Sequence, residues 1–78
     1  MTITPEQIKA ARRLLGWSQS DLAGHVGVSA TTIWVFEVGK PRPSALNLDL
    51  VRTAMEAAGV EFFAIGGDMG VRLRKGAK

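Results

Sequence analysis

The amino-acid sequence predicts a mainly α-helical fold in which four short helices are followed by a C-terminal β-hairpin. Four Ser or Thr residues stand where helix caps are expected, and each precedes apolar residues spaced three or four apart. After the last of these patterns, the chain changes to β-prone and alternating residues. A glycine follows each helical pattern, and we expect the four helices to end at Gly16, Gly27, Gly39 and Gly59.

The first helix is predicted over residues 5–15. Thr4 is its cap, Pro5 occupies the first helical position, and Gln7 stands three residues after the cap, as in a capping box. We expect its buried face to consist of Ile8, Ala11, Leu14 and Leu15.

Two shorter helices are predicted next, over residues 19–26 and 30–38. Ser18 begins the first with a capping-box-like pattern, and Ser29 begins the second. Gly27 permits a positive φ between them, so the pair is predicted to form a helix-turn-helix unit. The residues expected to face the core are Leu22, Ala23, Val26, Val28 in the turn, Ile33, and either Phe36 or Glu37.

A loop, a fourth helix and a hairpin complete the predicted domain. Two prolines exclude regular helix from residues 40–43, and Ser44 then caps a helix over residues 45–58. The expected buried stripe of this helix is Leu48, Val51 and Met55. The hairpin is predicted as strand 60–65, turn 66–70 and strand 71–74.

The composition excludes several classes of protein. The chain has 78 residues, enough for one domain, and no cysteine, which excludes disulfides and thiolate metal sites. Its single histidine, His25, leaves no histidine pair, so we expect no metal, no cofactor and no enzyme activity. No apolar run approaches the ~20 residues that span a bilayer, and signal-peptide features are missing at the start. We therefore expect a cytoplasmic protein.

The formal net charge of +3 is concentrated near the C-terminus. Residues 1–65 carry six basic and six acidic side chains, so the whole excess arises after them. A basic tail is typical of nucleic-acid-binding proteins, but it also favours solubility, and the sequence leaves both interpretations open. The charged side chains of this tail are Arg72, Arg74, Lys75 and Lys78, against Asp68.

Several segments, in this order and spacing, resemble the XRE family, the lambda-repressor and Cro-like helix-turn-helix proteins. They are LGWSQSDLA at residues 15–23, GVSATTI at 27–33, FEVG at 36–39 and RPS at 42–44. The resemblance covers roughly residues 4–59. It implies a four-helix lambda-repressor-like helix-turn-helix domain over residues 1–59. The predicted C-terminal β-hairpin at residues 60–75 lies beyond the resemblance and is a candidate dimerisation element of the same domain.

The resemblance also implies roles in binding double-stranded DNA. The helix over residues 30–38 would enter the major groove, with Thr31 in a main base-reading position, and Gln19 would touch the DNA backbone and the end bases. Arg12 and Glu37 would form an ion pair between the first and third helices. The implied DNA-binding residues are Ser18, Gln19, Ser20, Ser29, Ala30, Thr31, Thr32, Trp34, Val35 and, in the phosphate-gripping loop, Lys40 and Arg42.

The composition of the recognition helix departs from this family. Its outward positions lack the Arg, Gln, Asn and Lys side chains that commonly read bases, so we expect weak or unusually apolar readout. Trp34 and Val38 are expected to form an exposed apolar ridge, and Leu46 and Leu50 another on the fourth helix. Such a patch is typical of a dimer seam, a partner surface or an altered DNA-reading surface. The outward positions are Ala30, Thr31, Trp34, Val35 and Val38.

We therefore expect a sequence-specific DNA-binding transcriptional regulator, most simply a repressor, that acts as a homodimer. Pairing of the C-terminal strands would join the two chains, with apolar area from Phe62, Phe63, Val71 and Leu73. The alternative is a protein-interaction module on the same scaffold, antitoxin-like or an adaptor. It would bind its partner protein through Trp34, Val35, Val38, Leu46 and Leu50.

Overall fold

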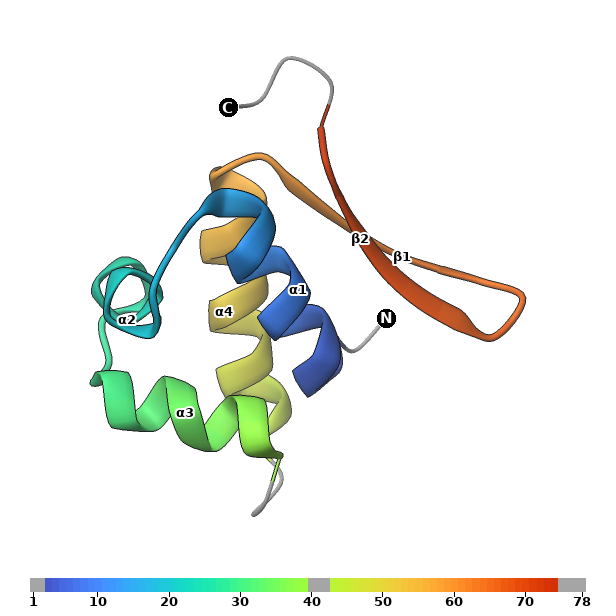
Figure 1. Cartoon of the computed structure of the whole chain (residues 1–78). Coiled ribbons are helices and arrows are strands. Elements are labelled where there is room, and N and C mark those ends of the chain that lie inside the picture. The colour runs from blue at the N-terminus through green and yellow to red at the C-terminus, as the bar shows by residue number, and fades with distance from the viewer. Residues whose placement is uncertain (1–2, 40–42, 75–78) are drawn as a thin grey trace.

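The computed structural model describes residues 3–39 and 43–74, which form four helices and a two-stranded antiparallel sheet. The helices gather in one body, and the hairpin extends away from it (Figure 1). The order and type of all six elements confirm the prediction. The elements are α1 (Pro5–Leu15), α2 (Gln19–Val26), α3 (Ala30–Val38), α4 (Ala45–Ala57), β1 (Val60–Ile65) and β2 (Asp68–Leu73).

The predicted cap residues begin all four helices. Each cap hydroxyl accepts a hydrogen bond from the backbone N–H three residues later, at 3.0–3.2 Å. The first three helices end at glycines in the left-handed region, as predicted. Helix α4 ends at Ala57, slightly earlier than predicted, because Ala58 already serves as a right-handed cap. The four caps are Thr4, Ser18, Ser29 and Ser44.

The core lies between the four helices and the near half of the hairpin. The prediction for Leu14 is wrong, since its side chain is 43% exposed. Ile8, Ala11 and Leu15 form a narrower stripe than expected, and Leu14 lies beyond its edge. None of the helices in the described ranges is long and apolar enough to cross a membrane. The buried apolar residues are Ile3, Ile8, Ala11, Leu22, Ala23, Ile33, Phe36, Leu48, Val51, Met55, Val60 and Phe62.

The hairpin turn is shorter than the predicted turn at residues 66–70. Gly66 and Gly67 alone connect the strands, with φ angles of 58° and 89°. Two central residues with positive φ are what a type I′ turn requires, and its twist matches that of paired strands. The strand β2 therefore begins at Asp68 and not at Val71, because pairing continues to the two-residue turn.

The two faces of the hairpin have different surroundings. Paired residues share a face, so Phe62 and Val71 point to the helices, while Phe63 and Gly70 lie on the opposite face. A Cβ atom at Gly70 would lie 2.4 Å from the ring of Phe63, so this ring covers the glycine. The guanidinium of Arg72 lies 5.5 Å from the centre of the same ring.

The buried amide of Gln7 joins α1 to both strands. Its Oε1 accepts a hydrogen bond from the backbone N–H of Thr4 at 2.9 Å, which completes the predicted capping box. Its Nε2 donates to the carbonyl oxygens of Gly70, at 2.9 Å, and Phe63, at 3.4 Å. Only the role of Gln7 in the cap was predictable from the sequence, because its contact with the strands depends on where the hairpin packs.

We predict that Gln7→Met lowers the free energy of unfolding by about 1–3 kcal/mol, because it leaves a buried carbonyl and the Thr4 N–H without partners. For a domain of this size, the melting temperature should fall by roughly 5 °C or more. Denaturant titration measures the change. Ala10→Met introduces the same side chain on the exposed face of α1 and should stay within about 0.5 kcal/mol of wild type. Equal stability of the two variants would contradict the anchoring role.

Candidate functional site

The turn between α2 and α3 sets the angle of the two helices. Gly27 adopts a φ of 89°, and its N–H donates to the carbonyl of Ala23 at 2.8 Å. The N–H of Val28 donates to the same carbonyl at 3.1 Å, and its half-buried side chain packs against the core. Both features confirm the predicted turn. The first turns of α2 and α3 are consequently held at a constant separation at the protein surface.

The start of α2 is stabilised by a reciprocal pair of hydrogen bonds. The Asp21 carboxylate accepts from the Ser18 N–H at 2.9 Å, and the Ser18 hydroxyl accepts from the Asp21 N–H at 3.0 Å. Hydrogen bonds from the Ser18 backbone and side chain, with the nearby His25, hold the pKa of Asp21 below its usual value. His25 is exposed and stacks on Trp17, with ring centroids 4.1 Å apart.

The predicted ion pair between α1 and α3 is present and largely buried. Arg12 donates two hydrogen bonds to the Glu37 carboxylate, at 2.7 and 3.1 Å, and a third to the carbonyl of Trp17 at 3.0 Å. The two charged side chains are 16% and 4% exposed. A two-bond contact of this kind fixes both distance and orientation between the helices.

Gln19, expected to touch DNA, is also part of this network. Its Nε2 donates to Glu37 at 3.2 Å, so the first turn of α2 is tied to the last turn of α3. Its carbonyl oxygen makes no hydrogen bond to another residue in the described ranges. The amide is therefore half-buried and oriented, with its acceptor side remaining for an external donor.

The outward side of α3 carries a continuous apolar stripe. Thr31, Trp34, Val35 and Val38 are spaced as one face of a helix, and Trp34 and Val38 are 54% and 46% exposed. Thr31 is exposed, and Val35 is half-buried. We call these four residues the α3 stripe. Ala30, also expected on this side, is half-buried and packs against the core.

The other predicted contact residues in the described ranges lie at the first turns of α2 and α3. Ser18, Ser20 and Ser29 are exposed at the first turns of the two helices. Thr32 is half-buried, and its hydroxyl forms a 2.9 Å hydrogen bond with that of Ser29. Lys40 and Arg42 lie outside the described residues.

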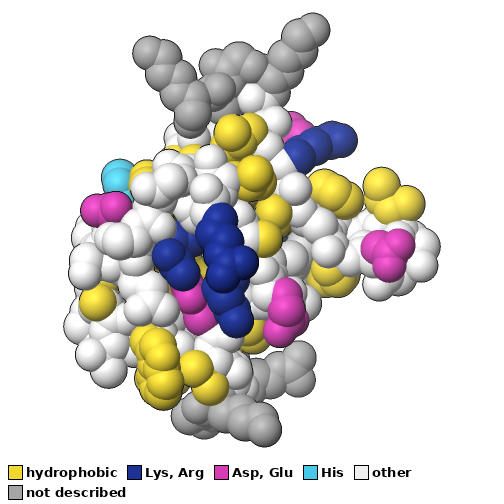
Figure 2. Space-filling view, viewed as in Figure 1, with side chains coloured by type: hydrophobic (Ala, Val, Ile, Leu, Met, Phe, Trp, Pro, Cys, Tyr) yellow, Lys and Arg dark blue, Asp and Glu magenta, His cyan; other side chains and the backbone are white. Residues whose placement is uncertain are grey.

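Apolar and basic side chains occupy separate areas on one face of the molecule. Figure 2 shows hydrophobic side chains over α3 and a group of Lys and Arg side chains over α1. On α1, Lys9 and Arg13 stand one turn apart, half-buried and exposed respectively. This pair was not predicted as a site, although a spacing of four residues places both side chains on one face of a helix. Leu46 and Leu50 on α4 are exposed as expected, at 69% and 47%.

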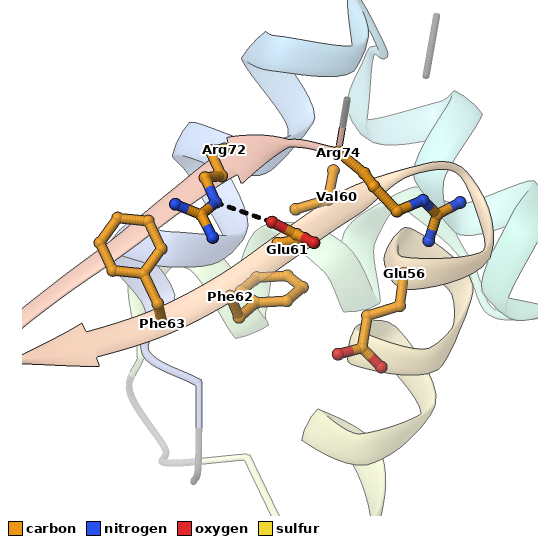
Figure 3. Close-up of a pocket in the computed structure, with 7 residues that line it drawn as sticks. All are labelled: Glu56, Val60, Glu61, Phe62, Phe63, Arg72 and Arg74. Carbon is orange, nitrogen blue, oxygen red and sulfur yellow. Dashed lines mark hydrogen bonds and ion pairs between the residues drawn. The ribbon is translucent and has the colours of Figure 1, made fainter. Parts of the chain in front are cut away.

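A surface hollow lies between the end of α4 and the hairpin (Figure 3). Its two carboxylates are paired: Arg72 donates to Glu61 at 2.7 Å, and Arg52 donates to Glu56 at 3.0 Å. Arg74 also lines the hollow. Within the described ranges, no cluster of three or more His, Cys, Asp or Glu side chains is arranged to hold a metal ion. The arrangement of paired charges has the character of a solvated surface.

A family model described as helix-turn-helix matches residues 8–56, well over half of the 78-residue chain. The match begins inside α1, ends inside α4, and includes α2, α3 and the turn between them. No curated protein matches the sequence significantly.

We predict that Arg12→Met destabilises the domain by about 3 kcal/mol or more, because it leaves the Glu37 carboxylate buried without its cation. The double variant Arg12→Met with Glu37→Met should be more stable than Arg12→Met, since no uncompensated charge remains. Denaturant titration compares them.

The exposed pair of Arg72 and Glu61 provides a matched control, because its N–O distance is also 2.7 Å. Arg72→Met should cost no more than about 1 kcal/mol. A double variant at Arg12 and Glu37 that is less stable than Arg12→Met would show that packing, and not charge burial, dominates this site.

Proposed function

Since the chain belongs to the XRE family of helix-turn-helix proteins, we propose that it is a transcriptional repressor that binds duplex DNA in a sequence-specific manner. Membership of this family supports a DNA-binding regulator, and we propose in addition that the regulator is a repressor. The observation that carries the proposal is the rigid pair α2–α3, which presents two helix starts and the α3 stripe together. A helix held in this way can enter a major groove while its partner crosses the DNA backbone.

The proposed contacts divide into two kinds. The first turns of both helices offer hydroxyls and backbone amides to phosphates, which positions the protein without reading sequence. Lys40 and Arg42 act on phosphates in the same way, and the basic side chains over α1, which lie on the same face as α3 (Figure 2), add attraction. Helix α3 contacts base edges. The groove-facing residues that we propose are Ser29, Ala30, Thr31, Thr32, Trp34 and Val35.

Repression follows from occupancy, because a protein seated in the groove excludes other proteins from the same DNA segment. Two half-sites about 34–36 Å apart would accommodate a symmetric dimer. We propose that the hairpins join the two chains, although three of the residues first assigned to this contact pack towards their own core. These are Phe62, Val71 and Leu73. The outer face instead offers Phe63 and, 69% exposed, Ile65.

One observation favours a second candidate function. Large apolar side chains are exposed on both α3 and α4, and soluble monomers rarely leave extended apolar areas uncovered. A protein-interaction module would bind its partner through Trp34, Val35, Val38, Leu46 and Leu50. Trp34→Ala separates the two functions: it weakens DNA binding if the groove is the target, and it breaks only a protein complex if the partner is a protein.

We predict that selection from a random duplex pool enriches a palindromic site. Titration against salt should then show log K falling linearly with log salt, with a slope of about −0.9 for each phosphate neutralised. Arg42→Ala should make the slope shallower by about 0.9 per lost phosphate contact. Arg52→Ala, on α4 and paired with Glu56, is the comparison and should leave the slope unchanged. The proposal fails if no duplex is bound even at low salt.

We predict that the chain sediments as a dimer at high micromolar concentration and that Ile65→Lys shifts it to monomer. A charge on the exposed apolar face of the hairpin would oppose contact between two copies, while the core residues of the hairpin stay untouched. Leu46→Lys alters an equally exposed residue on α4, outside the hairpin, and should leave the dimer intact. A wild-type monomer at this concentration would count against hairpin dimerisation.

A further inference from the structure

We infer that helix α3 reads the 5-methyl groups of thymine by apolar contact, in place of hydrogen bonds to base edges. This inference rests on the proposed DNA-binding function and adds the chemical class of its target, a groove rich in thymine methyls. In the major groove, the C5-methyl is the feature of thymine that an apolar side chain can distinguish.

Few hydrogen-bonding groups on and around the α3 stripe are available to read bases. The hydroxyl of Ser29 accepts the Thr32 N–H at 3.1 Å and shares a second hydrogen bond with the Thr32 hydroxyl. The Nε2 group of Gln19 is held by Glu37. Among the described residues of the α3 stripe, the remaining polar groups are the Thr31 hydroxyl and the Trp34 indole N–H. Neither provides the paired donor and acceptor that reads guanine or adenine in two-bond contacts.

The apolar side chains of α3 are spaced to match successive base pairs. Thr31, Trp34 and Val35 lie on one face over four residues, which is about 6 Å along a helix that rises ~1.5 Å per residue. Base pairs repeat every ~3.4 Å along the duplex. The three side chains can therefore meet methyl groups from about two successive base pairs, and Val38 extends the surface by one more turn.

Polar and basic groups near the α3 stripe favour DNA as its occupant. The α3 stripe lies on the helix to which Gln19 is hydrogen-bonded through Glu37, and exposed hydroxyls stand at the starts of both α2 and α3. Basic side chains over α1 lie on the same face as α3 (Figure 2). An apolar stripe with phosphate-binding groups at its border matches a groove, whose floor carries methyl groups and whose walls carry phosphates.

The experiment replaces thymine by deoxyuridine in the duplex selected by the wild-type protein, one position at a time. Deoxyuridine keeps the pairing and the O4 acceptor and lacks only the methyl group. Loss of one buried methyl lowers an equilibrium constant about fourfold, so two contacted positions should together lower affinity about fifteenfold. Deoxyuridine in the flanking sequence should have no effect.

A protein variant ties the effect to α3. Val35→Ala should weaken binding to the thymine duplex and reduce the ratio between thymine and deoxyuridine affinities, because the methyl contact is already lost. Thr53→Ala, on the exposed side of α4, should leave both affinities and their ratio unchanged. Circular dichroism of each variant confirms that the helices are retained.

The outcomes separate this inference from the function on which it rests. Specific binding with equal affinity for thymine and deoxyuridine duplexes would overturn the methyl readout alone. Absence of binding to any duplex at low salt would overturn the DNA-binding proposal and this inference with it. Capture of a purified protein partner through Trp34 and Val38, without DNA binding, would assign the α3 stripe to the alternative function.

Discussion

The buried carboxylate of Glu37 is the interaction on which the presented surface depends. It accepts hydrogen bonds from Arg12 on α1 and Gln19 on α2, so one side chain on α3 connects three helices. A charge that is 4% exposed is tolerated only when its partners stand within hydrogen-bond distance. The inner side of α3 is thereby held in one orientation, and its outer stripe faces solvent as a consequence. The turn at Gly27 fixes the angle between α2 and α3 where the end of α2 meets the start of α3.

A similar arrangement attaches the hairpin. Isolated two-stranded hairpins are marginal in water, so this one requires support from the helices. Part of that support is apolar, from Val60 and Phe62, and part is the amide of Gln7 beneath both strands. Because this amide also completes the cap of α1, the start of the first helix and the attachment of the hairpin are coupled. The far end of the hairpin, beyond this support, presents Ile65 to solvent.

The Glu37 network and the cap of α3 explain the unusual chemistry of the candidate interface. Polar groups near α3 are largely engaged in holding the fold: Gln19 on Glu37, Ser29 on Thr32, and Arg12 on Glu37. The side chains that remain outward are mostly apolar. Recognition through such a surface would rely on shape and methyl contacts, with phosphate contacts at its margins supplying affinity. The near neutrality of residues 1–65 keeps unspecific attraction to DNA small, so even modest methyl discrimination would be visible.

The sequence by itself determined the elements, because caps, glycine stops and apolar spacing are local signals. It also determined the pair of Arg12 and Glu37 through the family pattern. The exposure of Leu14, the two-residue turn and the second role of Gln7 became visible only in the tertiary structure. The exposure of Leu14 and the second role of Gln7 depend on segments distant in sequence, since the cover over a helix edge and the partner of a buried amide are decided by packing. The turn is instead local, because Gly66 and Gly67 adopt the positive φ angles of a two-residue turn when pairing extends to Ile65 and Asp68. Likewise, only packing showed that Phe62 is buried within its own chain.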